Sequence, residues 1–245
     1  MKGIVLAGGL GTRLMPLTAA TNKHLLPVYD QPMVFYPIQT LVRAGIDEVL
    51  VVTGGPHAGH FLRVLKNGQE LGLKHLEFAF QEGAGGIPVA LSLACDFADD
   101  EPIAVVLGDN TTDADISQAV GGFANGATVF LKKVPDPERF GVPEFDPQDK
   151  TKIVRIEEKP ATPKSDFAVT GLYLYDSQVF DIIKNLKPSS RGELEITDVN
   201  NHYLEAGKLN WFELDGFWSD TGTFESLFHS NQYWAQKKLP MKKGL

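Results

Sequence analysis

Residues 2–14 read KGIVLAGGLGTRL, a short apolar run that passes directly into a glycine-rich turn. Similar apolar runs recur at residues 49–52, 76–80 and 103–107. Such runs are typical of strands buried on both faces of a parallel sheet. Helical patterns lie between them, at about residues 33–44, 60–66 and 89–98. This alternation predicts a doubly wound, mostly parallel, Rossmann-like α/β sheet, with ligands at the carboxyl ends of the strands.

The second half of the chain has longer polar connections between its expected strands, at residues 127–133, 153–158, 168–175 and 209–214. Ser190–Arg191–Gly192–Glu193 fits a capping box, which predicts a helix from there to about Ala206. A last helix is expected from about Thr223 to Lys238. No linker or repeat marks a boundary. We therefore expect one domain over residues 1–245, with a smaller β-rich second half that forms one wall of the site.

Composition excludes several kinds of partner. The net charge of −8 argues against binding a nucleic acid polymer, which requires many cations to neutralise phosphates. No apolar stretch approaches the roughly 20 residues that cross a bilayer, so no membrane partner is expected. The first apolar run is too short for a signal peptide, which favours a cytoplasmic protein. Cys95, the single cysteine, is expected to be a small buried residue.

The glycine-rich turn carries the first chemical signal. Gly8, Gly9 and Gly11 allow backbone N–H groups to approach phosphate oxygens closely. No Gly-Lys-Ser/Thr run is present, and Leu14 stands where a dinucleotide-binding turn has its third glycine. Arg13 and Lys23 place two cations beside the turn, which favours a triphosphate ligand over a purely structural turn.

Several further runs follow in a fixed order. They are Pro16–Leu17–Thr18, Lys23–His24–Leu25–Leu26–Pro27–Val28, Leu107–Gly108–Asp109–Asn110, Glu157–Glu158–Lys159–Pro160, residues 169–173, residues 191–198 and Asp220–Thr221–Gly222–Thr223. In this order they resemble the sugar-phosphate nucleotidyltransferases. Residues 29–37, YDQPMVFYP, are most similar to the glucose-1-phosphate thymidylyltransferases. The resemblance covers nearly the whole chain and implies transfer of a deoxythymidylyl group from dTTP to glucose 1-phosphate, with release of pyrophosphate.

The resemblance also implies a role for each site residue. The implied nucleotide-binding residues are Leu6, Gly8, Gly9, Gly11, Thr12, Arg13, Gln81, Gly86 and Asp109. The implied sugar-phosphate residues are Gly141, Glu158, Lys159, Thr170, Gly171 and Arg191. Arg13, Lys23 and Lys159 are implied to be catalytic, and Asp109 and Asp220 to hold Mg²⁺, a cation that prefers oxygen ligands. Taken alone, Asp109 would be better explained by an Asx turn or a helix cap, and Asp220 could merely cap the last helix.

Some positions depart from the family pattern and leave alternatives open. Phe140 stands where a tyrosine is usual, and residues 82–89 and 111–113 also differ. Because the resemblance places residues 82–89 against the base, the same reaction with another triphosphate such as UTP, or with another sugar 1-phosphate, is the main alternative. A non-catalytic sugar-nucleotide sensor would be expected to lose one or more of the charged residues named above, and a glycosyltransferase would not need Arg13 and Lys23.

Two expectations concern assembly and regulation. The chain ends soon after Asp220, where longer family members continue with helices that help to form a regulatory nucleotide site. End-product control is therefore expected to be absent or rebuilt. A homo-oligomer is expected, although no sequence feature specifies its symmetry.

Overall fold

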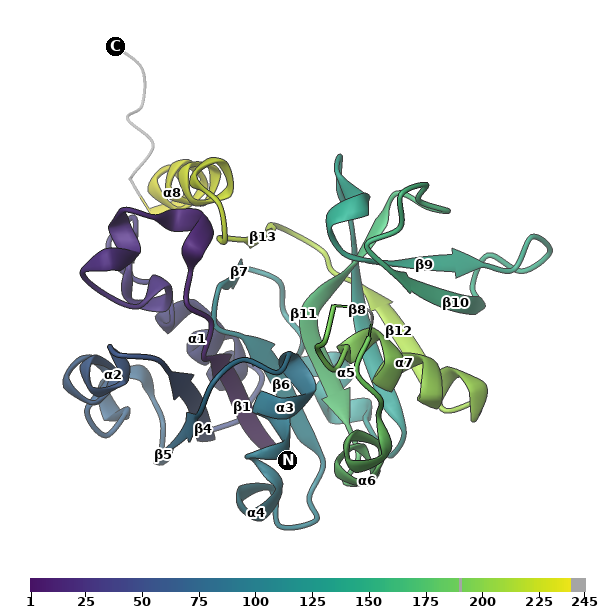
Figure 1. The fold of residues 1–245 in the computed structure, drawn as a ribbon, viewed down its shortest axis with the longest axis horizontal. Coiled ribbons are helices and arrows are strands. Elements are labelled where there is room, and N and C mark those ends of the chain that lie inside the picture. Colours follow the sequence, from purple (N-terminus) through teal and green to yellow (C-terminus); the bar gives the residue numbers. More distant parts are fainter. Residues whose placement is uncertain (190, 239–245) are drawn as a thin grey trace.

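The computed structural model describes residues 1–189 and 191–238 and confirms the doubly wound α/β sheet (Figure 1). The strands are β1 (Lys2–Ala7), β2 (Pro27–Val28), β3 (Gln31–Pro32), β4 (Glu48–Gly54), β5 (His75–Gln81), β6 (Ile103–Leu107), β7 (Asn110–Thr112), β8 (Ala127–Lys133), β9 (Gly141–Phe145), β10 (Ile153–Glu158), β11 (Phe167–Tyr175), β12 (Leu209–Glu213) and β13 (Trp218–Asp220). The α-helices are α1 (Phe35–Arg43), α2 (Ala58–Leu65), α3 (Ile87–Ser92), α4 (Cys95–Ala98), α5 (Ser117–Gly122), α6 (Gln178–Asn185), α7 (Ile196–Glu205) and α8 (Phe224–Lys238).

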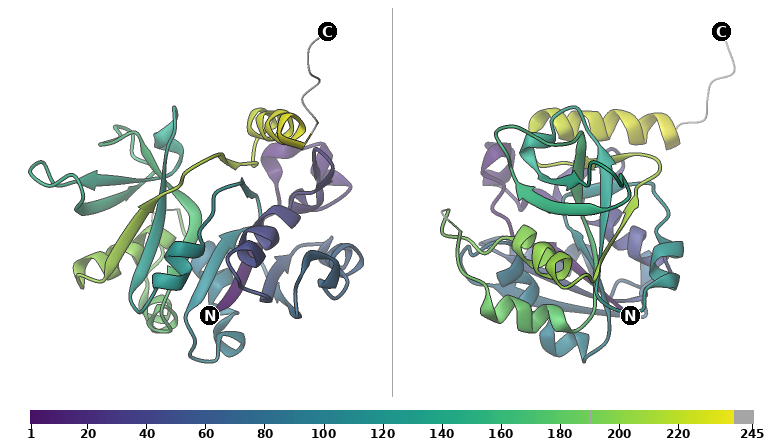
Figure 2. Two further views of the ribbon diagram at one scale, coloured as in Figure 1. Left: turned by 180° about the vertical axis from the view of Figure 1, so that it is seen from behind. Right: turned by 90° about the vertical axis from the view of Figure 1, so that its right-hand side faces the viewer.

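The centre of the main sheet is parallel. Strand β1 lies between β6 and β4, and β5 forms the edge beyond β4. Strand β11 pairs antiparallel with β6 and also with β8 and β9, so it joins the second-half strands to the parallel core. Both halves of the chain therefore share one sheet, and Figure 2 shows the second-half strands rising from it on one side.

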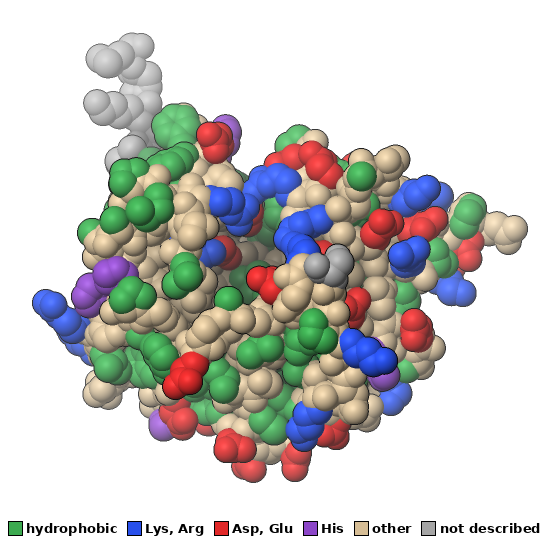
Figure 3. Space-filling model, in the orientation of Figure 1, with side chains coloured by type: hydrophobic (Ala, Val, Ile, Leu, Met, Phe, Trp, Pro, Cys, Tyr) green, Lys and Arg blue, Asp and Glu red, His purple; other side chains and the backbone are tan. Residues whose placement is uncertain are grey.

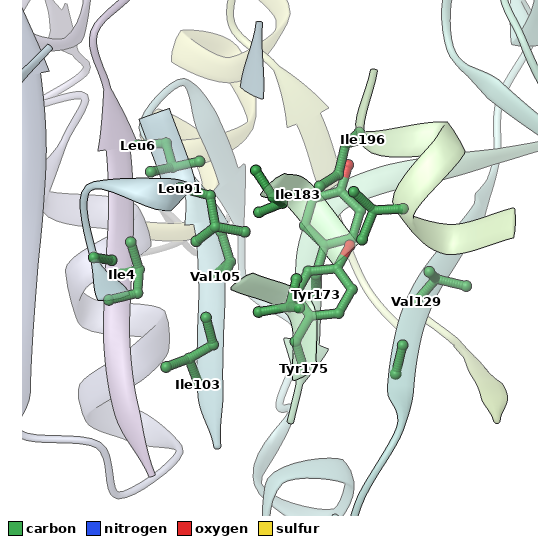
Figure 4. Packing of buried hydrophobic residues seen from close by; sticks show 14 of the residues in the cluster. Ile4, Leu6, Leu91, Ile103, Val105, Val129, Tyr173, Tyr175, Ile183 and Ile196 are labelled. Carbon is green, nitrogen blue, oxygen red and sulfur yellow. The ribbon is translucent and has the colours of Figure 1, made fainter. Parts of the chain in front are cut away.

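Alternation along β1 fills a core on each face of the sheet, because successive side chains of a strand point to opposite faces. Ile4 and Leu6 pack with residues of α3, α4, α6 and α7, including Leu91 and Ile183 (Figure 4). Val5 points to the other face, where α1, α2 and α5 supply the cover. The continuous apolar run of β1 is thus explained by burial on both sides.

Helix α8 covers the loop segment between β1 and α1. Its Trp234 packs against Leu14 and Met33, and its ring centroid lies 4.6 Å from that of Tyr36. The Tyr29 N–H donates a hydrogen bond of 2.7 Å to Asn231 Oδ1. Figure 1 shows α8 lying across this segment, which carries Arg13 and Lys23. The last helix therefore stabilises the part of the chain that presents both cations.

Two helices differ from expectation. Helix α7 begins at Ile196, because the preceding Glu195 has an extended backbone with φ −101° and ψ 134°. Ser190, the expected cap, lies outside the described residues. The single helix expected at 89–98 is two helices, and Cys95, expected to be buried, is exposed. Ala94 and Ala98, one helical turn apart, occupy the buried side, so Cys95 is rotated toward solvent.

Within residues 1–189 and 191–238, no helix has the length and apolar character needed to cross a membrane.

Candidate active site

The glycine-rich turn after β1 packs against two side chains from elsewhere in the chain. A short 3₁₀ helix, Thr12–Leu14, follows the turn. Gly11 has φ +68°, and a Cβ there would lie 2.8 Å from Cβ of Lys23. A Cβ on Gly8 would lie 2.5 Å from Gln81 Oε1. At position 11 a larger residue would be strained by the positive φ and would separate the turn from Lys23, so glycine is needed there. At position 8 the contact is with the flexible end of the Gln81 side chain.

Lys23 and Asp109 form an ion pair at the centre of the site. Lys23 Nζ lies 2.5 Å from Asp109 Oδ2, and the side chains are 13% and 15% exposed. Burial by itself would raise the pKa of Asp109, but the nearby Lys23 ammonium outweighs this and holds the pKa well below its usual range. Burial, with Lys23 adding to it, lowers the pKa of His24 to about 3. At neutral pH Asp109 is therefore ionised, beside a neutral imidazole.

A second carboxylate lies next to Asp109. Strands β13 and β7 pair antiparallel with Asp220 opposite Asn110, and the Thr221 N–H donates to the Asp109 carbonyl at 2.8 Å. Burial raises the pKa of Asp220 to about 6; Arg139 opposes the shift and Asp109 adds to it. Arg139 Nη2 lies 2.9 Å and 3.2 Å from the two carboxylate oxygens of Asp220.

These two carboxylates fit a divalent cation that takes further ligands from a substrate. Across residues 1–189 and 191–238, no group of three or more His, Cys, Asp or Glu side chains could hold a metal by itself. A Cβ on Gly222 would lie 3.8 Å from Asp109 Oδ2 and 3.8 Å from Asp220 Oδ2. It would also lie 3.3 Å from Arg13 Nη2. Two carboxylates with nearby cations match a hard, oxygen-preferring ion that completes its shell with phosphate and water.

A separate charged cluster lies at the end of β10. Thr197 Oγ1 donates to Glu158 Oε2 at 2.6 Å, which orients this carboxylate. Lys159 Nζ lies 3.4 Å and Arg191 Nη2 3.3 Å from Glu158 Oε1. Gly141 pairs with Glu158 across β9 and β10, and a Cβ there would lie 3.1 Å from Thr197 Oγ1. The cluster therefore offers two cations and one oriented carboxylate.

One cavity of about 470 Å³ joins the glycine turn, the Lys23–Asp109 pair and this cluster. Figure 3 shows it as a hollow on this face, with Lys and Arg side chains gathered along its edge. The predicted site residues that line it are Leu6, Gly8, Gly9, Gly11, Thr12, Lys23, Gln81, Gly86, Asp109, Glu158, Lys159 and Arg191.

The remaining predicted residues are not among those that line the cavity. Arg13 and Asp220 lie beside Gly222, as described above, and Gly141 lies beside Glu158. The Thr170 side chain is fully buried and its hydroxyl donates to the Phe130 carbonyl at 2.9 Å. The Gly171 N–H donates to Asn110 Oδ1 at 3.0 Å. In this structure the Thr170 hydroxyl and the Gly171 N–H thus bond protein atoms, and the predicted sugar contacts of both residues stay predictions.

The chain matches the family model for nucleotidyl transferases over residues 2–237. It belongs to the nucleotidyl transferase family. Its curated relatives include the glucose-1-phosphate thymidylyltransferase of Neisseria meningitidis, 46% identical over 95% of this chain and 82% of that protein. The enzyme of the same name from Mycolicibacterium smegmatis is 42% identical over 100% of this chain and 85% of that protein.

Solved structures agree with this membership. A provisionally named glucose-1-phosphate thymidylyltransferase from Bacillus anthracis, solved with a sucrose, has a TM-score of 0.91 and 47% identity. The match covers 99% of this chain and 98% of that chain. A UDP-glucose pyrophosphorylase bound to UDP-glucose has a TM-score of 0.83 at 22% identity, covering 97% of this chain and 99% of that one. That second likeness shows a shared fold.

Three further side chains of the site in this nucleotidyl transferase were not predicted from the sequence. Thr197 orients Glu158, Glu195 Oε2 lies 2.7 Å from Arg191 Nη2, and Arg139 pairs with Asp220. Thr197 and Glu195 lie inside the run 191–198 that carries the family resemblance, so their position could have marked them. Arg139 directly precedes Phe140, but nothing in the sequence indicates that it reaches Asp220.

Proposed function

We propose that this nucleotidyl transferase transfers a deoxythymidylyl group from dTTP to glucose 1-phosphate, giving dTDP-glucose and pyrophosphate. The observation that carries the proposal is the single cavity, which has a glycine turn at one end and two cations with an oriented carboxylate at the other. The Lys23–Asp109 pair lines the same cavity. The relatives named glucose-1-phosphate thymidylyltransferase support the choice of substrates.

The nucleotide is assigned to the end formed by the glycine turn. Backbone N–H groups of Gly8, Gly9 and Gly11 would donate to phosphate oxygens, because no side chain keeps the ligand at a distance. Gln81, which is buried at the end of β5, and the backbone of Gly86 would contact the pyrimidine edge. Both residues line the same cavity as the turn.

Asp109 and Asp220 would hold Mg²⁺ together with phosphate oxygens of the nucleotide. When bound, the cation neutralises phosphate charge and orients the triphosphate for displacement. Asp109 is kept ionised by its ion pair with Lys23, so a carboxylate oxygen is available at neutral pH. The proximity of Arg13 to both aspartates places a further positive charge where the triphosphate would lie.

The sugar 1-phosphate is assigned to the opposite end. Lys159 and Arg191 would hold its phosphate, and Glu158, oriented by Thr197, would accept hydrogen bonds from sugar hydroxyls. A phosphate oxygen of the sugar attacks the α-phosphorus as the bond to the pyrophosphate leaving group breaks. The attacking oxygen is already anionic, so no general base is needed and catalysis consists of positioning and charge stabilisation. Arg13 and Lys23 would stabilise the charge on the departing pyrophosphate.

Pyrophosphate release tests this proposal directly. The purified protein is incubated with glucose 1-phosphate and Mg²⁺, in parallel with dTTP, UTP, CTP, GTP or ATP. Fast release with dTTP is the expected result, with or without release from UTP. Release with another triphosphate alone would keep the reaction and overturn the base assignment, which is the alternative raised by the unusual residues 82–89. Absence of release with every triphosphate would favour another sugar 1-phosphate or the sugar-nucleotide sensor.

Two further assignments belong to this proposal. Nucleoside triphosphates and sugar phosphates are metabolites of the cytoplasm, so we propose that the enzyme acts there. We also propose a homo-oligomer, because Phe224 and Phe228 lie one turn apart on α8 and are 44% and 59% exposed. Light scattering coupled to size exclusion would give the mass in solution, and a monomer would contradict this assignment.

A further inference from the structure

Arg139 makes a set of contacts that the proposed reaction leaves unexplained. It ends a short 3₁₀ helix, Pro137–Arg139, just before β9. Its Nη2 bonds both carboxylate oxygens of Asp220, at 2.9 Å and 3.2 Å, and its Nη1 donates to Asp136 Oδ2 at 2.6 Å. One guanidinium group therefore bridges two carboxylates and holds each on a separate terminal nitrogen, in the fixed planar geometry of its donors.

The guanidinium is held from a third side by an aromatic ring. Its Cζ lies 5.1 Å from the ring centroid of Phe140, and this ring lies 5.4 Å from that of Trp218, with the two rings tilted edge to face. The Arg139 side chain is 32% exposed and is not among the residues that line the cavity. Arg139 is thus fixed behind Asp220, away from the space assigned to substrate.

Three cations surround the paired carboxylates, and their surroundings differ. Lys23 lines the cavity, and Arg13 lies beside Gly222 without an ion-pair partner within 4.0 Å among the described residues. Arg13 is therefore not held by an ion pair and can turn toward a triphosphate, whereas Lys23 is paired with Asp109. Arg139 is anchored by Asp136 and Phe140, so it stays on Asp220 when phosphates arrive.

The segment that carries Arg139 also contacts the sugar-phosphate cluster. The carbonyl of Phe140 accepts a hydrogen bond of 2.9 Å from the Lys159 N–H. The next residue, Gly141, pairs with Glu158. A displacement of Arg139 and Phe140 would therefore move the backbone that carries Lys159 as well as the carboxylate of Asp220.

We propose that Arg139 is a positioning residue: the contact of its Nη2 with both carboxylate oxygens fixes Asp220 for the divalent cation that accompanies the nucleotide. The hydrogen bond from the Lys159 N–H to the Phe140 carbonyl aligns Lys159 with it. The inference rests on the proposed function. Partners that orient a metal ligand typically contribute 10–100-fold to metal affinity. Loss of Arg139 is therefore expected to weaken the binding of nucleotide in the presence of Mg²⁺ and to leave binding without Mg²⁺ unchanged.

The test measures dTTP binding by equilibrium dialysis without sugar 1-phosphate, so that no turnover occurs. Each protein is titrated once with Mg²⁺ and once with EDTA, and the ratio of the two dissociation constants gives the benefit of the metal. Arg139→Met is compared with the wild type and with Arg155→Met, a control on the exposed side of β10. Arg139→Lys keeps the charge but loses the two separate terminal nitrogens that hold Asp136 and Asp220. It serves also if Arg139→Met fails to fold.

We expect the benefit of Mg²⁺ to fall about tenfold or more in Arg139→Met and several-fold in Arg139→Lys, with little change in EDTA. Arg155→Met should match the wild type. If the ratio of the dissociation constants with EDTA and with Mg²⁺ equals that of the wild type in Arg139→Lys, or in a folded Arg139→Met, the positioning role is overturned. The proposed function is then left intact. Equal losses with and without Mg²⁺ would overturn it in favour of a merely structural role. Failure of the wild type to bind dTTP under either condition would instead overturn the proposed function, and this inference with it.

Discussion

Lys23→Met separates the two roles assigned to Lys23, as the partner of Asp109 and as a contact for the leaving group. The two charges are 2.5 Å apart and the side chains are 13% and 15% exposed, so the variant leaves a largely desolvated carboxylate without its cation. Removing one partner of a buried pair costs about 3–5 kcal/mol. Asn110 Nδ2 still donates to Asp109 Oδ1 at 3.0 Å, so the lower end, about 3 kcal/mol, is expected.

The double variant Lys23→Met/Asp109→Asn tests the origin of that loss. An amide at position 109 carries no charge, and its oxygen can still accept the hydrogen bond from Asn110. Most of the lost free energy of unfolding should therefore return. Turnover should not return, because removal of one preorganised charge contact lowers kcat by roughly 10²–10³ and the double variant also lacks a metal ligand.

Urea unfolding gives the free energies, and pyrophosphate release with dTTP and glucose 1-phosphate gives kcat. If the double variant is no more stable than Lys23→Met, the unpaired carboxylate is not the cause of the loss. If Lys23→Met turns over at the wild-type rate, Lys23 does not stabilise the leaving group.

Three other predictions use the same two assays. Arg13→Ala should lower kcat by roughly 10²–10³, and wild-type turnover would refute its role. The pKa of His24 is lowered from an ordinary 6.5 to about 3 in the folded state. Between these two pH values the unfolded chain binds the extra proton, so the free energy of unfolding falls as the pH is lowered through this range. This group alone should lower stability by about 2 kcal/mol between pH 7 and pH 5, and a His24→Gln variant with an unchanged pH dependence would contradict this. Gly86→Ala should destabilise several times more than Gly83→Ala, for which about 1 kcal/mol is expected. Both glycines have positive φ, but a Cβ on Gly86 would lie 2.1 Å from the Leu194 carbonyl oxygen, whereas Gly83 has no atom within 4 Å; equal losses would refute the crowding.

The sequence predicted the parts of the fold that depend on neighbouring residues. Short apolar runs marked β1, β4, β5 and β6. Strands β1, β4 and β6 are buried on both faces, as such runs predict, but β5 was expected to be buried as well and is instead a mostly exposed or half-buried strand at the sheet edge. Short strands such as β7 and β13 were not predicted, since two or three residues carry no periodic pattern. Cys95 was misplaced for a related reason: an apolar stretch indicates burial of a segment, and only the rotation of the helix decides which residue faces solvent.

The same distinction between local sequence and tertiary structure applies to the candidate site. The amino-acid sequence by itself determined which residue types are present and in what order: the glycine turn, the cations and the two aspartates. Tertiary structure decided which of them meet, because Asp109 and Asp220 come together only when β13 pairs with β7. The ion pair between Arg139 and Asp220 joins residues 81 positions apart. The buried Thr170 hydroxyl donates a hydrogen bond to a carbonyl of the neighbouring strand β8. Such contacts are set by strand pairing over long separations, which local sequence does not encode.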